Sequence, residues 1–199
     1  PDIVALQEIQ DDSGPTNDGV VEARRTAGRL LSALLPLRYE YCEVPPADLA
    51  DGGQPGGNIR SAFLYRTDRV RLVSRGQPQT GRQLKVLEGP QLSMSPGRLG
   101  TNEPAFRDSR KPLAAEFEFN GKTLFLFNCH LKSKRGDSPI FGRYQPRILG
   151  SERIRLQQAR IINGMIQELL SGQADANVIV LGDLNDFIHS ESLQVLCGE

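Results

Sequence analysis

Three short polar clusters, each placed directly after an apolar run, hold the residues of this chain that are best suited to chemistry. They are Leu6-Gln7-Glu8 after residues 3–5, Asn128-Cys129-His130 after residues 124–127, and Asp183-Leu184-Asn185 after residues 178–181. Short apolar runs of this kind are typical of buried strands. The pattern therefore predicts strands that end at a carboxylate, at an imidazole and at an Asp-x-Asn pair.

Side chains two positions apart on a strand project to the same side. Asp183 and Asn185 are therefore expected to point together, and so are Asn128 and His130. If the three strands lie side by side and run the same way, one rim of a sheet receives these groups together with Glu8.

These groups could divide the tasks of phosphoester hydrolysis among them. Mg²⁺, or Mn²⁺ or Ca²⁺ in its place, prefers oxygen ligands, and the carboxylate of Glu8 is the obvious one here. Such an ion polarises a phosphoryl oxygen and offsets the charge that develops on it. Asp183 could orient or deprotonate the attacking water, and Asn185 could donate hydrogen bonds to the phosphate. His130 belongs to the residue type that titrates near neutral pH, and it could protonate a leaving oxygen.

Each of these residues taken alone also has a purely structural explanation. Glu8 could be a solvated residue at a strand boundary, His130 a core or rim histidine, and residues 182–185 a turn held by local backbone bonds. Their joint occurrence after matching strands favours chemistry. His189, the other histidine, has no ligand spacing around it and is interpreted as a surface residue.

The net formal charge of the chain is zero, but the positive charge is concentrated in one segment. Residues 131–160 contain eight Lys or Arg and two Asp or Glu, a net charge of +6, so the remainder carries −6. Phe141 and Tyr144 are interleaved with these cations, which fits a surface that tracks phosphates and stacks on bases. A solvated loop and helix face is the alternative explanation.

Length and composition indicate one globular domain with an ordinary core: 199 residues, 38% hydrophobic. Three cysteines without a C-x-x-C spacing argue against a disulfide framework and against a zinc knuckle. The longest apolar runs are too short to cross a bilayer. Neither a phosphate-binding glycine motif nor a G-x-S-x-G nucleophile is present. The compartment, cytoplasmic or secreted, and the oligomeric state stay open.

The predicted elements are strands alternating with two helices and several long loops. Strands are expected at residues 3–8, 39–44, 61–66, 70–73, 113–119, 122–130 and 177–181, helices at 20–34 and 151–170, and loops at 45–58, 76–112 and 132–150. The inward face of the second helix would be Leu156, Ala159, Ile162, Ile166 and Leu169. Asn120-Gly121 predicts a hairpin between two of the strands. The last strand is apolar at every central position, which predicts cover on both of its faces.

Four segments together resemble the endonuclease/exonuclease/phosphatase superfamily. They are residues 2–8, Ser61-Ala62-Phe63-Leu64-Tyr65-Arg66, Asn128-Cys129-His130-Leu131-Lys132-Ser133-Lys134, and Gly182-Asp183-Leu184-Asn185-Asp186. The resemblance implies the deoxyribonuclease-I-like α/β fold, a four-layer α/β sandwich of two packed mixed sheets flanked by helices. The run from His130 to Lys134 is closer in style to bacterial nucleases of the superfamily than to its inositol phosphatases.

Carried over by this resemblance, Glu8 is similar to a metal-binding glutamate and His130 to a histidine that assists the leaving group. Asp183 and Asn185 resemble a pair that contacts water, phosphate and sometimes a second metal ion, so the resemblance makes Asp183 a metal-binding candidate beside Glu8. Arg110 resembles a phosphate-contacting arginine. Further candidates for contact with substrate phosphate are Asn128, Lys132, Lys134 and Arg153.

The family pattern also has an Asn-bearing first strand and a closing Asp-His strand that this chain does not contain. The expectation is therefore a single domain over residues 1–199, truncated at both ends. The function implied is a divalent-metal-dependent hydrolase of phosphodiester bonds, in particular a nuclease acting on DNA or RNA. Two alternatives stay open: a phosphatase or a phospholipid or inositol-phosphate hydrolase on the same fold, and a catalytically incomplete fragment that binds polyanions.

Overall fold

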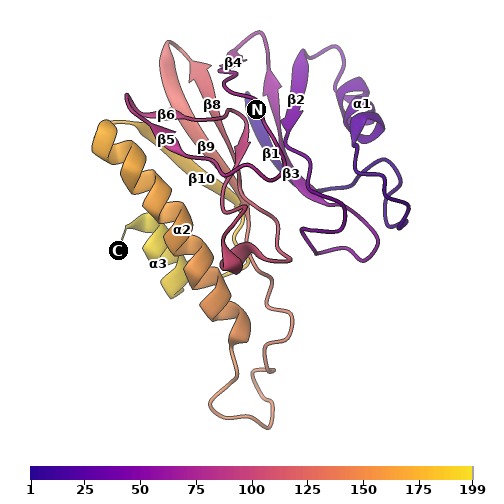
Figure 1. Ribbon diagram of the computed structural model, residues 1–199, viewed down its shortest axis with the longest axis vertical. Coiled ribbons are helices and arrows are strands. Elements are labelled where there is room, and N and C mark those ends of the chain that lie inside the picture. Colours follow the sequence, from indigo (N-terminus) through magenta and orange to yellow (C-terminus); the bar gives the residue numbers. More distant parts are fainter. Residues whose placement is uncertain (199) are drawn as a thin grey trace.

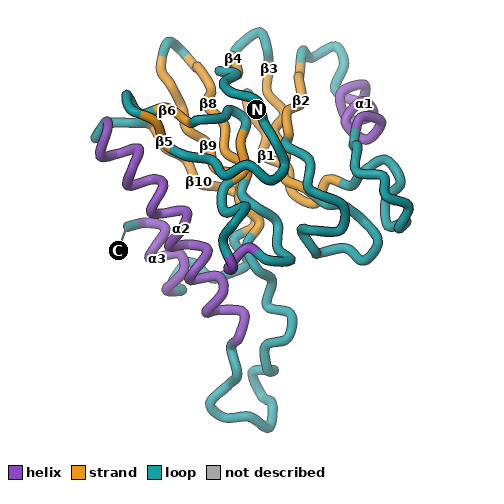
Figure 2. The backbone as a smooth tube through the Cα atoms, in the orientation of Figure 1, coloured by secondary structure: helices purple, strands orange, loops and turns teal. Residues whose placement is uncertain are grey.

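The computed structural model describes residues 1–198 and contains two β-sheets packed against each other, with helices on the outside (Figures 1 and 2). The first sheet has the order β1-β3-β2 and is antiparallel. Its strands are β1 (Ile3–Ile9), β3 (Arg60–Arg66) and β2 (Tyr39–Glu43).

The second sheet is mixed and has the order β10-β9-β8-β4, with β7 also paired to β8. Parallel pairing joins β10 to β9, and the other pairs are antiparallel. Its strands are β10 (Asn177–Asp183), β9 (Lys122–His130), β8 (Leu113–Phe119), β4 (Val70–Leu72) and β7 (Gly97–Arg98). A separate small hairpin consists of β5 (Val86–Leu87) and β6 (Gln91–Leu92).

The long helix α2 (Gly150–Gly172) and the short helix α3 (Glu191–Cys197) flank the second sheet, and α1 (Arg24–Ala33) lies beside β2 (Figure 1). This order of helix, sheet, sheet and helix gives the four layers expected from the sequence. No helix in the described part of the chain combines the length and the apolar character needed to cross a membrane.

Strand β9 contributes to two separate cores because its side chains alternate between its two faces. Leu126 faces the first sheet and joins a cluster with Phe63 and Phe117, whose rings meet edge to face at 5.5 Å. Phe125 and Phe127 face the other way and belong to the cluster that includes residues of α2. The same alternation continues to the end of β9 and determines which side its polar residues face.

The hairpin prediction is confirmed, since β8 and β9 have the expected bounds and Asn120 and Gly121 have φ angles of 50° and 71°. Those positive angles are what a two-residue hairpin turn requires. The predicted first helix begins later, at Arg24, and the predicted loop at 76–112 contains three short strands and a 3-10 turn, η1 (Pro104–Phe106).

Two expectations about burial are wrong. On α2, Leu156 is only half-buried, and the polar side chains of Arg155 and Gln158 take the buried positions instead. On β10, Val178 and Val180 pack on the core that includes α2, but Ile179 on the opposite face is 45% exposed. The reason is that β10 lies at the edge of its sheet, where the described first sheet covers only part of that face.

Candidate active site

The predicted site residues lie where the ends of β1, β9 and β10 meet. His130 and Asp183 are direct register partners on the parallel pair β9 and β10. The three strands do not share one sheet as expected, since β1 belongs to the first sheet and Glu8 reaches the site across the interface. Even so, His130 Nε2 lies 3.8 Å from Glu8 Oε1 and 3.8 Å from Asp183 Oδ2.

A bulge in β1 turns the side chain of Glu8 toward that interface. The register of β1 against β3 shifts between Leu6 and Ile9, and Glu8 within this interval has a φ of 57°. Left-handed backbone is uncommon for a residue other than glycine and costs about 1–3 kcal/mol. Bulges of this kind redirect side chains beside functional sites.

Asn128 links the two sheets immediately behind the site. Its Oδ1 accepts a hydrogen bond of 2.6 Å from Gln7 Nε2, and its Nδ2 donates to the backbone oxygens of Leu6 and Ala62, each at 2.9 Å. The side chain is completely buried. The interpretation of Asn128 as a phosphate contact is therefore wrong, because its amide is inaccessible and is committed to holding β1 and β3 against β9.

His130 is buried, and its environment favours the neutral imidazole. Burial is the main cause that lowers its pKa, and the positive charge of Arg110 lowers it further, while Asp183 and Glu8 act in the opposite direction. Among the described residues Nδ1 has no hydrogen-bond partner, and Nε2 is the ring atom that faces the carboxylates.

Arg110 places a buried cation behind the two carboxylates. Its Nη2 donates to the backbone oxygen of Leu131 at 3.2 Å, and its Nε is buried without a partner in residues 1–198. Burial lowers its pKa, and the charges of Glu8, Asp51 and Asp183 act to raise it. A guanidinium keeps its charge under such conditions, so Arg110 offers positive charge and unused donors.

The glycine-rich loop 45–58 lies close to this arginine and contains a buried aspartate that was not expected from the sequence. Asp51 forms ion pairs with Arg98 and with Lys111 Nζ, the latter at 2.8 Å, and all three side chains are largely buried. A Cβ on Gly53 would lie 3.4 Å from Arg110 Nη1. The only sequence signal was a lone acidic residue directly before paired glycines.

Asp183 and Asn185 form the turn that ends β10. The backbone N–H of Asn185 donates to Asp183 Oδ1 at 2.9 Å, and Asn185 has a φ of 51°. Asn185 Nδ2 donates at 3.1 Å to the backbone oxygen of Leu131, which also accepts from Arg110. The purely structural explanation of this motif is thus also true: the local turn exists, and it fixes Asn185 beside the site.

The two carboxylates are open to solvent, in contrast to the histidine between them. The side chains of Glu8 and Asp183 are 67% and 52% exposed. Asp183 and Asn185 also line a hollow of about 540 Å³ together with Lys134 and Phe187. A ligand can therefore approach Asp183 and Asn185 from this side.

Asp186 anchors the turn to the helices. Its Oδ2 accepts from Arg155 Nε and Ser192 Oγ, both at 2.9 Å, and its Oδ1 pairs with Lys134 Nζ at 3.1 Å. Burial acts to raise its pKa, but these hydrogen bonds and the backbone N–H of Phe187 outweigh it and lower the pKa to about 2.

Arg155 also links Asp186 to the residues that follow β9. It is 2% exposed and donates to the backbone oxygen of Lys132 at 3.1 Å and to Ser151 Oγ at 2.7 Å. No role for Arg155 or Asp186 was expected from the sequence. The available signal was that Ser151, Arg155 and Gln158 occur at the helical spacing of the apolar face.

The other predicted phosphate contacts lie farther from His130. Lys134 borders the hollow, where its Nζ lies 3.7 Å from the centre of the Phe187 ring. Lys132 is half-buried at the exit of β9, and Arg153 is exposed on α2. Within residues 1–198, neither of these two forms an ion pair with Glu8 or Asp183. His189 is exposed and stacks on Phe187, in agreement with its interpretation as a surface residue.

The donor set fits a hydrated hard cation. In the part of the chain that the structure describes, no group of three or more His, Cys, Asp or Glu is arranged to hold a metal ion. Mg²⁺ is commonly held by only one or two carboxylates and keeps several of its waters. The exposed carboxylates of Glu8 and Asp183, on either side of His130 Nε2, meet that requirement.

Comparison with solved structures identifies the fold. The catalytic domain of human Nocturnin with bound sulfate is 19% identical, with a TM-score of 0.54 over 98% of this chain and 55% of that one. An endonuclease/exonuclease/phosphatase family protein from Bacteroides thetaiotaomicron is 17% identical, with a TM-score of 0.51 over 99% of this chain and 53% of that one. A conserved protein of unknown function from Enterococcus faecalis V583 is 18% identical, with a TM-score of 0.51 over 100% and 58%.

The chain thus spans little more than half the length of these structures. No protein-family model and no curated protein matches the sequence. The structural matches show the deoxyribonuclease-I-like α/β fold, which is the fold expected from the sequence motifs.

Proposed function

We propose that this chain, with its deoxyribonuclease-I-like fold, carries the hydrolytic centre of a divalent-cation-dependent phosphodiesterase that acts on nucleic acid. The observation that carries the proposal is the convergence of Glu8 and Asp183 on His130 Nε2, each at 3.8 Å, from two different sheets. Fold alone does not select a chemistry, so the proposal depends on this group of side chains.

Glu8 and Asp183 would hold the cation. When bound, the ion polarises a phosphoryl oxygen and offsets the negative charge that develops there. Asp183 orients the attacking water and accepts its proton as the water oxygen forms the new bond to phosphorus. Asn185 has one amide N–H engaged with the backbone oxygen of Leu131, which leaves its second N–H to donate to the phosphate.

His130 serves the leaving oxygen. In the free protein burial and Arg110 lower the pKa of the imidazole, which favours its neutral form. The negative charge of a phosphodiester near Nε2 favours the protonated ring, so binding of the phosphate prepares His130 to give its proton to the leaving oxygen as the phosphorus–oxygen bond breaks. The positive charge of Arg110, which already acts on Glu8 and Asp183, would offset part of the negative charge on the phosphate.

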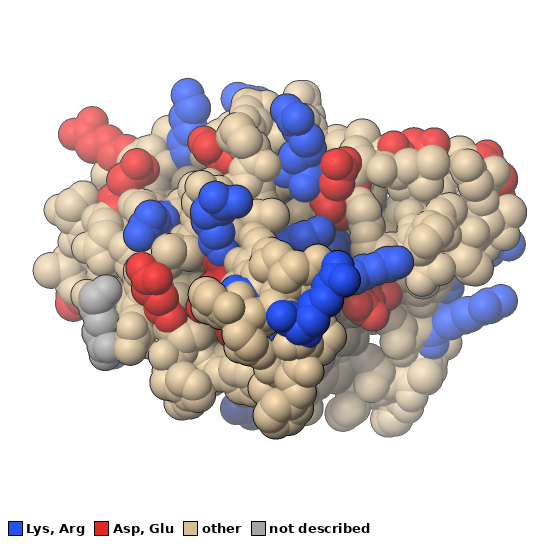
Figure 3. Space-filling view, turned by 90° about the horizontal axis from the view of Figure 1, so that it is seen from below, with Lys and Arg blue, Asp and Glu red and all other residues tan. Residues whose placement is uncertain are grey.

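The charge distribution supports a nucleic acid as the substrate. The segment with net charge +6 begins directly after His130 and continues into α2. Seen from the end at which this segment projects, the molecule displays many Lys and Arg side chains, with Asp and Glu among them (Figure 3). Cations gathered beside a phosphoester-cleaving centre attract a polymer with a regularly charged backbone.

Cleavage of supercoiled plasmid and of a single-stranded oligonucleotide, with Mg²⁺ and with EDTA, tests the proposal. We expect cleavage with Mg²⁺ only, and we expect Glu8→Gln to raise the Mg²⁺ concentration needed for half-maximal rate by about tenfold, since it removes one charged ligand. Glu88→Gln, the same change at an exposed position in the β5–β6 hairpin, is the matched control. Cleavage that is insensitive to EDTA, or equal effects of the two variants, would contradict the proposal.

One observation favours a second candidate, a lipid-acting hydrolase on the same scaffold. Ile140, Phe141 and Ile148 are exposed on the loop that follows His130, and an enzyme that works on membranes needs such an apolar element. Hydrolysis of phospholipid vesicles or of inositol phosphates, with plasmid left intact, would select this candidate. Binding of oligonucleotide without any turnover would select the incomplete polyanion-binding fragment.

A further inference from the structure

We infer that the loop of residues 132–149 is a docking surface for single-stranded nucleic acid, with an unpaired base stacked on Phe141. This inference rests on the proposed function, because it places the substrate strand beside the same site. The loop leaves β9 directly after the site and projects beyond the first turn of α2, away from both sheets (Figures 1 and 2).

The tip of the loop exposes apolar side chains to an extent that folding does not explain. Phe141 is 98% exposed and Ile140 62%, and Tyr144 and Ile148 are also exposed. A Phe ring with nearly all of its surface in water contributes nothing to the core of its own protein. Exposed apolar groups bordered by polar ones are typical of interaction sites.

The cations around this tip are available to phosphates. The loop contains five Lys or Arg and one Asp, a net charge of +4. In residues 1–198, Arg135 and Arg143 form no ion pair with any carboxylate, whereas the guanidinium of Arg147 donates to the Ser138 backbone oxygen. The guanidinium of Arg143 lies 4.7 Å from the centre of the Tyr144 ring, so that a cation and an aromatic ring are presented together. Aromatic rings alternating with unpaired cations are the composition of single-strand binding surfaces.

The base of the loop is closed by hydrogen bonds, which hold the tip in place. Ile148 N donates to Ser138 Oγ at 2.8 Å, and Arg147 Nη2 donates to the Ser138 backbone oxygen at 3.0 Å. Asp137 Oδ1 accepts from Ser151 N at 2.9 Å, which ties the base to α2. Residues 139–147 therefore form a tip on a fixed base. Binding then costs less conformational entropy in this tip than it would in a free chain.

Single-stranded nucleic acid fits this surface better than a duplex or a membrane. The faces of the bases inside a duplex are covered by their neighbours, so that Phe141 stacks more readily on a base that is unpaired. The tip has no regular secondary structure, and insertion into a bilayer would strip water from its unpaired backbone groups.

The chain contains no tryptophan, so Phe141→Trp introduces a single indole as a direct reporter. We expect oligothymidylate, added in EDTA to prevent cleavage, to quench the emission of this indole by stacking, and a blunt duplex to quench it far less. Leu35→Trp, at a 72% exposed position just after α1, is the matched control and should not respond. We also expect Phe141→Ala to weaken oligothymidylate binding by about tenfold, the loss of one stacked base.

Unchanged emission of Phe141→Trp, or an unchanged dissociation constant for Phe141→Ala, would overturn the inference. A blue shift of the indole on anionic vesicles, with no response to oligothymidylate, would overturn it in favour of a lipid surface. The quenching and binding measurements need neither metal nor turnover. Their outcome is therefore independent of whether the proposed hydrolysis occurs. Asp183→Asn should abolish cleavage while it leaves the quenching of Phe141→Trp intact.

Discussion

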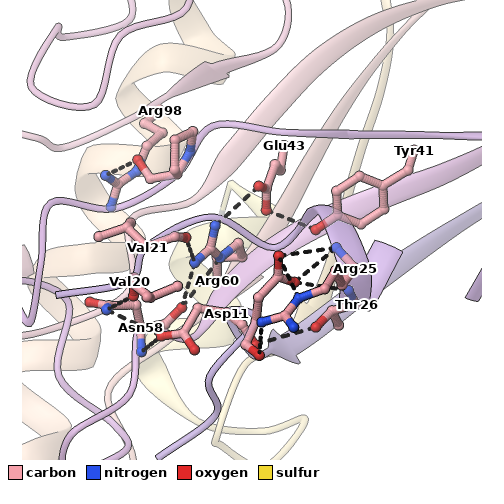
Figure 4. Close-up of polar contacts among 12 residues, drawn as sticks. Asp11, Val20, Val21, Arg25, Thr26, Tyr41, Glu43, Asn58, Arg60 and Arg98 are labelled. Carbon is pink, nitrogen blue, oxygen red and sulfur yellow. Dashed lines mark hydrogen bonds and ion pairs between the residues drawn. The ribbon is translucent and has the colours of Figure 1, made fainter. Parts of the chain in front are cut away.

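The candidate active site and the polar cluster beside α1 both bury charged side chains, but they differ in how many partners those side chains have. We define the α1-side cluster as Asp11, Glu43, Asn58 and Arg60 (Figure 4). The Asp11 carboxylate accepts from the backbone N–H groups of Ser13, Gly14 and Asn58 at 2.7–3.0 Å. Arg60 pairs with Glu43 at 3.0 Å and donates to the backbone oxygens of Asn58 and Val21.

By comparison, several active-site side chains lack hydrogen-bond or ion-pair partners. His130 Nδ1 and Arg110 Nε have no partner within residues 1–198, and the carboxylates of Glu8 and Asp183 face solvent. Buried polar groups are nearly always paired, so each exception calls for an explanation. This difference indicates that the α1-side cluster, whose side chains are fully paired, stabilises the fold. The active-site side chains, which lack such partners, are available to a ligand.

The largest expected effect separates the two regions by activity. His130→Ala should lower kcat for oligonucleotide cleavage by about 10³-fold, because a proton donor to the leaving oxygen contributes on that order. Binding of the same oligonucleotide in EDTA should change little, since the imidazole acts mainly in the transition state. Single-turnover rates and anisotropy titrations measure the two quantities. His189→Ala, at an exposed histidine, is the control, and equal losses in both variants would remove His130 from the mechanism.

Substitution in the α1-side cluster should lower the stability of the protein rather than its activity. Asp11→Ala removes the acceptor of several buried N–H groups and should lower the free energy of unfolding by about 3 kcal/mol. The kcat per folded molecule should stay near that of the parent chain. Urea unfolding together with cleavage rates at low denaturant provides the measurement. A fall in kcat without loss of stability would show that the cluster takes part in the chemistry.

The sequence predicted the parts of the site that depend on local pattern. The strand that ends at His130 and the strand over residues 177–181, which in the structure continues to Asp183, follow from apolar runs. The Asn120-Gly121 hairpin follows from turn preference. The position of Glu8 could not be predicted in this way, because it depends on which strands pair and on a bulge in β1. Those features arise from contacts between segments far apart in the chain.

The roles of Asn128 and Arg155 were missed for a related reason. A polar residue in a strand or on an apolar helix face has the same appearance in sequence whether it meets a substrate or a distant backbone group. Asn128 meets the backbone of Leu6 and Ala62, and Arg155 meets Asp186. Only the packing of the two sheets and of α2 distinguishes these cases.

The smallest effect concerns Asp186, which belongs to the active-site turn but has the complete set of partners found in the α1-side cluster. Its pKa is about 2 in the folded protein, below the ordinary value of 3.8. Above about pH 4 the carboxylate is ionised in both the folded and the unfolded chain, and its full contribution of about 2 kcal/mol is present. As the pH falls from about 4 toward 2, the unfolded chain takes up the proton first, and this contribution is lost.

Asp186→Asn should therefore lower the free energy of unfolding by about 2 kcal/mol at pH 7 and flatten its decline between about pH 4 and 2. Asp175→Asn makes the same change in charge at an exposed position before β10 and should do neither. Urea unfolding at a series of pH values measures both quantities. If the free energy of unfolding of Asp186→Asn still falls steeply at acid pH, other carboxylates cause that fall. The activity of folded Asp186→Asn then sharpens the comparison: a lower kcat would show that the anchor of the turn positions Asp183 and Asn185, whereas an unchanged kcat would place Asp186 with the structural cluster.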